Sequence, residues 1–125
     1  MKLNIVYLIT PLNFKDRDEI VKSEELAESY RKKIEQEFTC RTIAPHAKLA
    51  TILNVNIDEE KEMGQRFQME LFSLCDSVVI CGTFPSWRAM REVRLAHERN
   101  IPVYYYDNET EELVKIPKIE ELIHN

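Results

Sequence analysis

The feature that most constrains the fold is the order of elements in segment 75–106. An apolar run at 77–81 ends at Gly82, a turn and an amphipathic helix follow, and a β-branched and aromatic run occupies 101–106. This order predicts two parallel strands joined by a helix, the βαβ unit. Because ligands of parallel sheets bind where the strands end, we expect Gly82 and Ser86 at the mouth of a site.

The rest of the chain alternates between strands and helices in the same manner. The expected elements are, in order, a strand at 3–9, a helix at 23–38, a short strand at 41–44, a brief helix from about 48 to 53, a helix from about 58 to the strand at 77, and a short strand and a terminal helix in the tail at 107–125. Such alternation predicts an α/β fold, a three-layer doubly wound sandwich with about four to five parallel strands, Rossmann-like or flavodoxin-like. With 125 residues, the chain is expected to form one domain over 1–125.

The charge balance argues against polyanionic partners. The chain has 17 basic and 22 acidic residues, a net charge of −5, so it offers no basic footprint to nucleic acid or to an acidic membrane. No apolar run reaches the roughly 18 residues of a membrane span, and the first strand begins almost at Met1, which leaves no place for a signal peptide. We therefore expect a cytoplasmic protein whose partner is a small molecule, with no contact to nucleic acid or membrane.

Glycine and cysteine usage limits the cofactors that the chain can bind. Only Gly64 and Gly82 are present, whereas dinucleotide-binding and P-loop motifs need several glycines for the backbone to approach phosphate. The three cysteines, Cys40, Cys75 and Cys81, lack metal-ligand spacing, and their odd number favours reduced thiols. We expect no cofactor and no metal.

The candidate catalytic residue is Glu92, which lies six residues after Ser86 on the helix that follows the expected site. A carboxylate at the boundary of a buried helix face can act as a nucleophile or a base. The alternative for Glu92 is a solvated helix charge or a partner for Arg88 or Arg99. Ser86 precedes a helix N-terminus that favours anions, but a serine there is also a common N-cap.

Three other side chains are candidates for contact with a ligand, and each also has a purely structural interpretation. His46, directly after Pro45 at a strand end, faces the carboxyl edge of the sheet, where it either contacts a ligand or makes a structural hydrogen bond. Tyr7 in the first strand is either part of the core or a ligand contact. Trp87 either stacks on a base or ring at the site mouth or folds back onto the core.

Taken together, these segments resemble those of the nucleoside 2-deoxyribosyltransferase-like proteins, and more closely their small, often phage-borne, relatives. The resemblance covers the first strand to about Tyr106 and rests on the Tyr-Leu-Ile-Thr-Pro run at 7–11, Ala-Pro-His at 44–46, the strand and its flanks at 74–82, Ser86 with Glu92 and Ala96, and Ile-Pro-Val at 101–103.

The resemblance implies a role for several residues. Glu92 would attack the anomeric carbon of a 2-deoxyribonucleoside or its 5′-phosphate, the base would leave, and the sugar would pass to another base or to water. Tyr7 would help to place this nucleophile. The implied substrate contacts are Thr10, Pro11, His46, Gln68, Gly82, Ser86, Trp87 and Arg88. We also expect a homo-oligomer, because a domain this small leaves its site open on one side and a neighbouring subunit can close it, through either the helix at 58–75 or the C-terminal tail.

Three positions depart from the family pattern. Thr10 and Arg88 stand where glycine is usual, and a side chain at either position narrows the pocket. Gln68 stands where the enzymes carry an aspartate that handles the leaving base or the sugar hydroxyl, and an amide exchanges no proton. Two functions therefore remain open: an enzyme acting at the N-glycosidic bond, and a protein that binds a nucleotide or a nucleotide-derived signal without turnover. A plain protein interaction module is the third interpretation.

Overall fold

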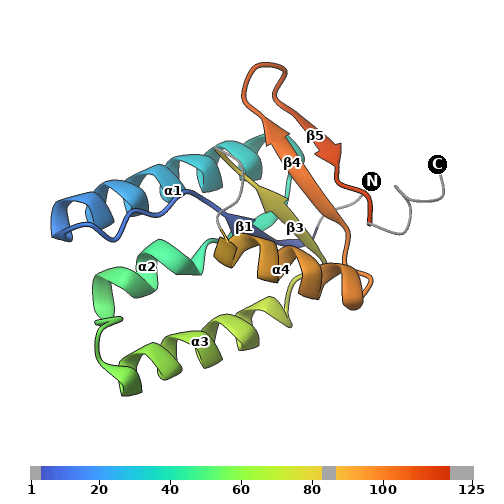
Figure 1. The fold of residues 1–125 in the computed structure, drawn as a ribbon. Helices are drawn as coiled ribbons and strands as arrows, with labels where there is room; N and C mark the ends of the chain where they lie inside the picture. Colours follow the sequence, from blue (N-terminus) through green and yellow to red (C-terminus); the bar gives the residue numbers. More distant parts are fainter. Residues whose placement is uncertain (1–3, 83–86, 119–125) are drawn as a thin grey trace.

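The structure of the protein is a computed structural model that describes residues 4–82 and 87–118. Its elements are β1 (Ile5–Ile9), α1 (Arg17–Phe38), β2 (Arg41–Ile43), α2 (Pro45–Ile52), α3 (Asp58–Phe72), β3 (Ser77–Ile80), α4 (Trp87–Glu98), β4 (Val103–Asp107) and β5 (Glu112–Lys115) (Figure 1). The strands form one sheet in the order β2-β1-β3-β4-β5. This arrangement confirms the predicted α/β sandwich with a mostly parallel sheet.

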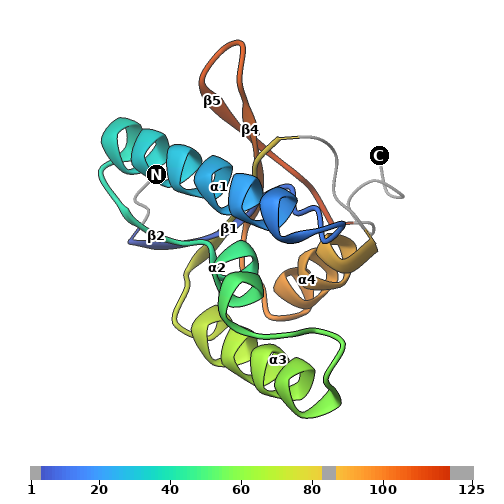
Figure 2. The same cartoon turned by 90° about the vertical axis from the view of Figure 1, so that its left-hand side faces the viewer.

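Four strands of the sheet are parallel, and β5 is the exception because it returns from β4 as an antiparallel hairpin. Crossovers between parallel strands are right-handed, so the direction of each step along the sheet decides which face its helix covers. The step from β1 to β2 runs opposite to the steps from β2 to β3 and from β3 to β4. Accordingly, α1 covers one face, α3 and α4 cover the other, and α2 lies between α1 and α3 (Figure 1 and Figure 2).

Each face of the sheet has its own apolar core, because successive side chains of a strand point to opposite faces. Val6 and Leu8 of β1 pack toward α1, whereas Tyr7 and Ile9 pack toward α3 and α4. Cys75 and Cys81 are free and buried, one in each core, and desolvation by burial raises the pKa of Cys75 to about 11 and that of Cys81 to about 12. Both thiols therefore behave as small apolar side chains.

Two helix starts differ from the prediction. The first helix begins at Arg17, ahead of the predicted start at 23, because the Asp16 carboxylate caps it by accepting a 2.9 Å hydrogen bond from the amide of Glu19. The second helix begins at Pro45 and not near Lys48, since proline is well suited to the first helical position. The predicted terminal helix lies partly at 119–125, outside the described residues.

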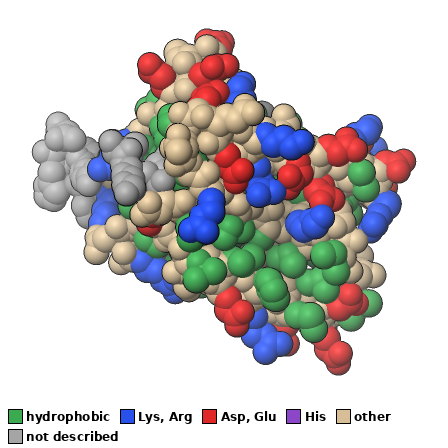
Figure 3. Space-filling model, turned by 180° about the vertical axis from the view of Figure 1, so that it is seen from behind, with side chains coloured by type: hydrophobic (Ala, Val, Ile, Leu, Met, Phe, Trp, Pro, Cys, Tyr) green, Lys and Arg blue, Asp and Glu red, His purple; other side chains and the backbone are tan. Residues whose placement is uncertain are grey.

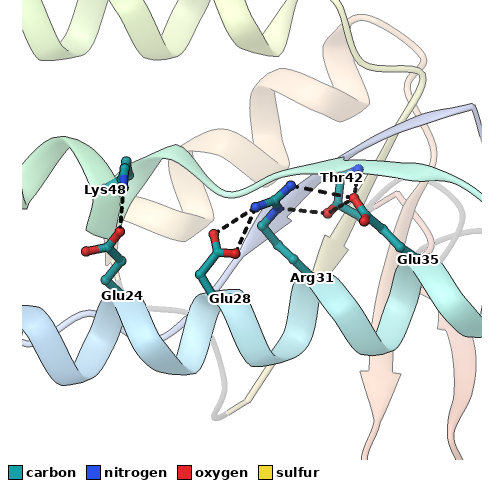
Figure 4. Close-up of polar contacts among 6 residues, drawn as sticks. All are labelled: Glu24, Glu28, Arg31, Glu35, Thr42 and Lys48. Carbon is teal, nitrogen blue, oxygen red and sulfur yellow. Dashed lines mark hydrogen bonds and ion pairs between the residues drawn. The ribbon is translucent and has the colours of Figure 1, made fainter.

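Hydrogen bonds and ion pairs of charged side chains connect helix α1 to β2 and α2 (Figure 4). The Glu35 carboxylate accepts hydrogen bonds from the Thr42 amide at 2.9 Å and from the Thr42 hydroxyl at 2.8 Å, and Arg31 lies 3.6 Å from the same oxygen. Further along, Lys48 pairs with Glu24 at 2.9 Å. Burial desolvates Glu35, but the Thr42 hydrogen bonds and the Arg31 charge outweigh this effect and lower its pKa.

The 22-residue helix α1 is the longest in the described part of the chain, and charged residues recur along its whole length. No helix among the described residues combines the length and apolar character that crossing a membrane requires.

Candidate active site

Three side chains from three elements meet on the α3 and α4 side of the sheet. Glu92 Oε1 of α4 lies 2.7 Å from His46 Nε2 at the start of α2, and the Tyr7 hydroxyl of β1 lies 3.2 Å from the same nitrogen. Only 5% of the His46 side chain and 15% of the Glu92 side chain are exposed. The chain therefore places a carboxylate, an imidazole and a phenol in direct contact at a nearly buried position.

Local structure explains why these residues meet. Tyr7 points away from α1, and its ring packs edge-on against Phe72 at 5.0 Å and against His46 at 5.8 Å between ring centres. Pro45 starts α2 directly after β2, so His46 lies at the carboxyl edge of the sheet. Helix α4 buries Val93 against the sheet, and Glu92, one position earlier, lies at the edge of that buried face.

One nitrogen of the imidazole makes both polar contacts. His46 Nε2 lies 2.7 Å from Glu92 Oε1 and is hydrogen-bonded to the Tyr7 hydroxyl at 3.2 Å, with donor and acceptor roles that depend on the imidazole tautomer. The other two atoms of the pair, His46 Nδ1 and Glu92 Oε2, are buried without a hydrogen-bond partner among the described residues. A buried polar atom without a partner costs about 1–3 kcal/mol, so this arrangement is poorly explained by stability alone.

A cavity of about 510 Å³ lies beside this pair, between α2, α3 and α4. His46, Gln68 and Glu92 are in its wall, with Gln68 contributed by α3. The other described lining residues combine apolar and charged side chains, among them Leu49, Leu53, Leu95, Lys61, Arg91 and Arg94. A cavity of this size with a few polar groups in an apolar wall is typical of a site for a small organic ligand.

The remaining predicted contacts lie elsewhere or outside the described residues. Thr10, Pro11 and Gly82 lie at the carboxyl ends of β1 and β3, and the described lining of the cavity does not include them. Gly82 has a positive φ of 87°, and a Cβ on it would lie 2.6 Å from Pro11 Cγ. Ser86 and the side chains of Trp87 and Arg88 lie outside the described part of the structure.

The contact between His46 and Glu92 is the main feature that sequence reasoning missed, although it named both residues. Forty-six positions separate them, and no periodic pattern reports such a contact. Arg94 was also missed, and its only signal was its place on the helix that carries Glu92. Across residues 4–82 and 87–118, no group of three or more His, Cys, Asp or Glu side chains is arranged to hold a metal ion.

The fold defines an α/β protein with a Rossmann-like sandwich, and a cavity lies between its helices α2, α3 and α4. Its fold is similar to that of a 2-deoxyribosyltransferase from the psychrotolerant bacterium Bacillus psychrosaccharolyticus, with a TM-score of 0.58, 10% sequence identity, and coverage of 90% of this chain and 99% of that chain. Residues 4–106 match the family described as a domain of unknown function (DUF7768), and the chain belongs to that family. No curated protein matches its sequence.

Proposed function

We propose that the protein acts at the N-glycosidic bond of a 2-deoxyribonucleoside or its 5′-phosphate, by transfer or hydrolysis, with Glu92 as the nucleophile. The observation that carries this proposal is the geometry of Glu92 beside the cavity. One carboxylate oxygen lies 2.7 Å from His46, and the other has no hydrogen-bond partner in the described part of the chain. The fold shared with a 2-deoxyribosyltransferase supports the same chemistry.

The reaction follows from the position of the carboxylate. A Glu92 oxygen forms a bond to the anomeric carbon while the carbon–nitrogen bond breaks, and the bonding electrons leave with the base, which then takes a proton from water. A second base or water next attacks the same carbon and releases the carboxylate. This route divides one difficult displacement into two easier ones, as retaining glycosidases do. Tyr7 and His46 act as positioning residues that hold the carboxylate in one orientation.

The cavity also supports the choice of substrate class. Its volume suits a nucleoside, and its apolar residues offer a surface for the flat face of a base. Arg91 and Arg94 lie in the same wall, and guanidinium groups bind phosphate well. We therefore include the 5′-phosphate, together with the free nucleoside, among the substrates to be tested.

A second candidate function is binding of a nucleotide without turnover. Gln68 favours it, because this residue lines the cavity beside Glu92 and presents an amide. An amide neither donates nor accepts a proton usefully at neutral pH, so departure of the base lacks an acid at that position. In this alternative the protein senses or sequesters a nucleotide-derived ligand.

Chromatographic measurement of free base separates the two functions. The purified protein is incubated with the four common deoxyribonucleosides and with their 5′-monophosphates, and the thermal stability of each mixture is recorded. We expect base release by the wild type and a loss of at least about 100-fold in Glu92→Gln, which keeps the shape but removes the nucleophile. Glu109→Gln, at an exposed turn position distant in sequence, is the control and should match the wild type.

The remaining outcomes are equally informative. Thermal stabilisation by a nucleotide without base release supports the binding protein. Base release that persists in Glu92→Gln contradicts the proposed nucleophile. Neither release nor stabilisation with any of the eight compounds contradicts both functions.

A further inference from the structure

Helix α3 has an apolar surface on one side and contributes to the cavity wall on the other. Met63 is 50% exposed and Phe67 is 51% exposed, and neither is in the described lining of the cavity. Figure 3 shows hydrophobic side chains gathered in the lower part of the rear face, in the region of α3. The polar side chains that α3 contributes to the cavity wall are Glu60, Lys61, Gln65 and Gln68. Lys61 and Gln65 are exposed, whereas Gln68 is partly buried.

Few polar side chains of the described wall are withdrawn from solvent. Those that are at least partly buried are His46, Glu60, Gln68 and Glu92. His46 and Glu92 contact each other at 2.7 Å, and a Glu60 carboxylate oxygen accepts a 3.2 Å hydrogen bond from the backbone amide of Asn54. The Gln68 amide makes no hydrogen bond to any described residue. Among these side chains, Gln68 is therefore the one that is left to contact a ligand.

The chemistry of an amide limits what Gln68 can do for a leaving base. Its NH2 group donates hydrogen bonds and its carbonyl oxygen accepts them, but it has no proton to transfer at neutral pH. A donor that points at developing negative charge nevertheless stabilises that charge. His46 does not replace the missing acid, because its Nε2 already contacts Glu92 and Tyr7 and its Nδ1 is buried.

We propose that Gln68 selects the leaving base: the base departs as an anion that the Gln68 amide stabilises by a hydrogen bond, without a proton from the protein. The inference rests on the proposed function, since Glu92 displaces the base. As a Glu92 oxygen bonds to the anomeric carbon, the carbon–nitrogen bond breaks and both of its electrons pass to the base. The anion then takes a proton from water. The hydroxide that remains combines with the proton released when water or a second base attacks the sugar.

This mechanism defines a class of substrates. A base anion is more stable when conjugated carbonyl groups share its charge, and a carbonyl oxygen is also the acceptor that an amide N–H group requires. Uracil and hypoxanthine carry a carbonyl group where cytosine and adenine carry an amino group, and the two members of each pair have nearly the same shape. The protein therefore acts on nucleosides of oxo bases in preference to those of the corresponding amino bases.

Base release from two matched pairs of compounds tests the proposal. The pairs are 2′-deoxyuridine with 2′-deoxycytidine and 2′-deoxyinosine with 2′-deoxyadenosine, each measured as the nucleoside and as the 5′-monophosphate. We expect kcat/KM to be at least about tenfold higher for the oxo member of each pair. 5-Fluoro-2′-deoxyuridine should react faster than 2′-deoxyuridine, because fluorine stabilises the base anion and leaves the carbonyl groups in place.

The outcomes separate this inference from the proposed function. Equal kcat/KM values within both pairs, as expected if Lys61 or Glu98 at the exposed part of the wall supplied a proton, would overturn the inference and leave the proposed function standing. Slower release of 5-fluorouracil than of uracil would do the same. No base release from any of the compounds would overturn both.

Variants of Gln68 test whether this residue is responsible. Gln68→Met keeps the length of the side chain but removes the amide, and it should lower kcat/KM for 2′-deoxyuridine at least about tenfold. Gln68→Glu introduces a carboxyl group that can transfer a proton, and at about pH 5 it should bring the members of each pair to within about threefold of one another. Gln36→Glu, the same change at an exposed position of α1, is the control and should match the wild type.

Thermal unfolding of each variant checks that the fold is intact. Unchanged kcat/KM in Gln68→Met, or the full preference for oxo bases in Gln68→Glu, would overturn the assignment to Gln68.

Discussion

His46 makes Glu92 more than a surface charge. The sequence left a solvated helix residue and a structural histidine as alternatives, and either would have been compatible with the spacing alone. In the structure the two side chains form a nearly buried pair, with the Tyr7 hydroxyl against the same imidazole nitrogen. Sequence patterns report which residues share an element face, but a contact between α2 and α4 depends on how the helices pack.

Removal of the His46 contact should affect the chemical step more than binding. In His46→Ala the carboxylate loses the imidazole contact at Oε1, and we expect kcat to fall by about 10- to 100-fold with little change in KM. His46→Gln should recover part of the loss, because its amide can donate to the same oxygen. Steady-state kinetics of base release measures both parameters. A change confined to KM would instead place His46 in direct contact with substrate.

The helices and strands were predictable where hydrophobic periodicity is strong, and less so at their ends. The apolar residues of the strand at 77–81 and of the helix that carries Glu92 have the spacing expected of a strand and of a helix. Both elements are present in the structure. The start of α1 was missed because Asp16 lies in a charged stretch, where its capping hydrogen bond decides the boundary. The antiparallel direction of β5 depends on the tight hairpin after β4, which the charged tail did not reveal.

The junction of α1 with β2 should depend on pH through Glu35. Because the folded-state pKa of Glu35 is lowered, its ionised form stabilises the fold above the unfolded-state pKa, near 4.5, and this contribution disappears as the pH falls through the folded-state pKa. We expect Glu35→Gln to lower the free energy of unfolding by about 1 kcal/mol at pH 7, after allowance for its partial exposure.

Urea unfolding at several pH values measures this effect. The difference between wild type and Glu35→Gln should shrink below pH 4.5. Glu25→Gln, an exposed change on the same helix, should show neither the loss nor its pH dependence. A constant difference from pH 7 to acid would assign the loss to packing and not to charge.

The loop after β3 should be intolerant of any side chain at Gly82. Its φ of 87° is unfavourable for residues with a Cβ, and that Cβ would meet the Pro11 ring at 2.6 Å. We expect Gly82→Ala to destabilise the fold by about 1–3 kcal/mol in thermal or urea unfolding. Gly64→Ala is the matched control, because its Cβ would lie 3.3 Å from Leu53 within a helix. Equal losses in the two variants would contradict this account of Gly82.

At the scale of the whole molecule, alternation of strands and helices was enough to predict the α/β class, and the handedness of crossovers then fixes which helix covers which face. The cavity could not be predicted in the same way. Its wall joins Phe14, α2, α3, α4 and the loop after α2, and side chains from all of these segments define its shape. The apolar periodicity of α3 is visible in the sequence, but only the folded structure shows that this face of the helix is exposed to solvent.

The central claim, that the Glu92 carboxylate bonds to the sugar, is tested most directly by mass spectrometry of the protein quenched in acid during turnover of a deoxyribonucleoside. The account predicts a 2-deoxyribosyl group on the peptide that contains Glu92, absent in Glu92→Gln, and formed together with one equivalent of free base. Release of base with the sugar attached to another residue, or a stoichiometric burst of base with no attached sugar, would contradict it.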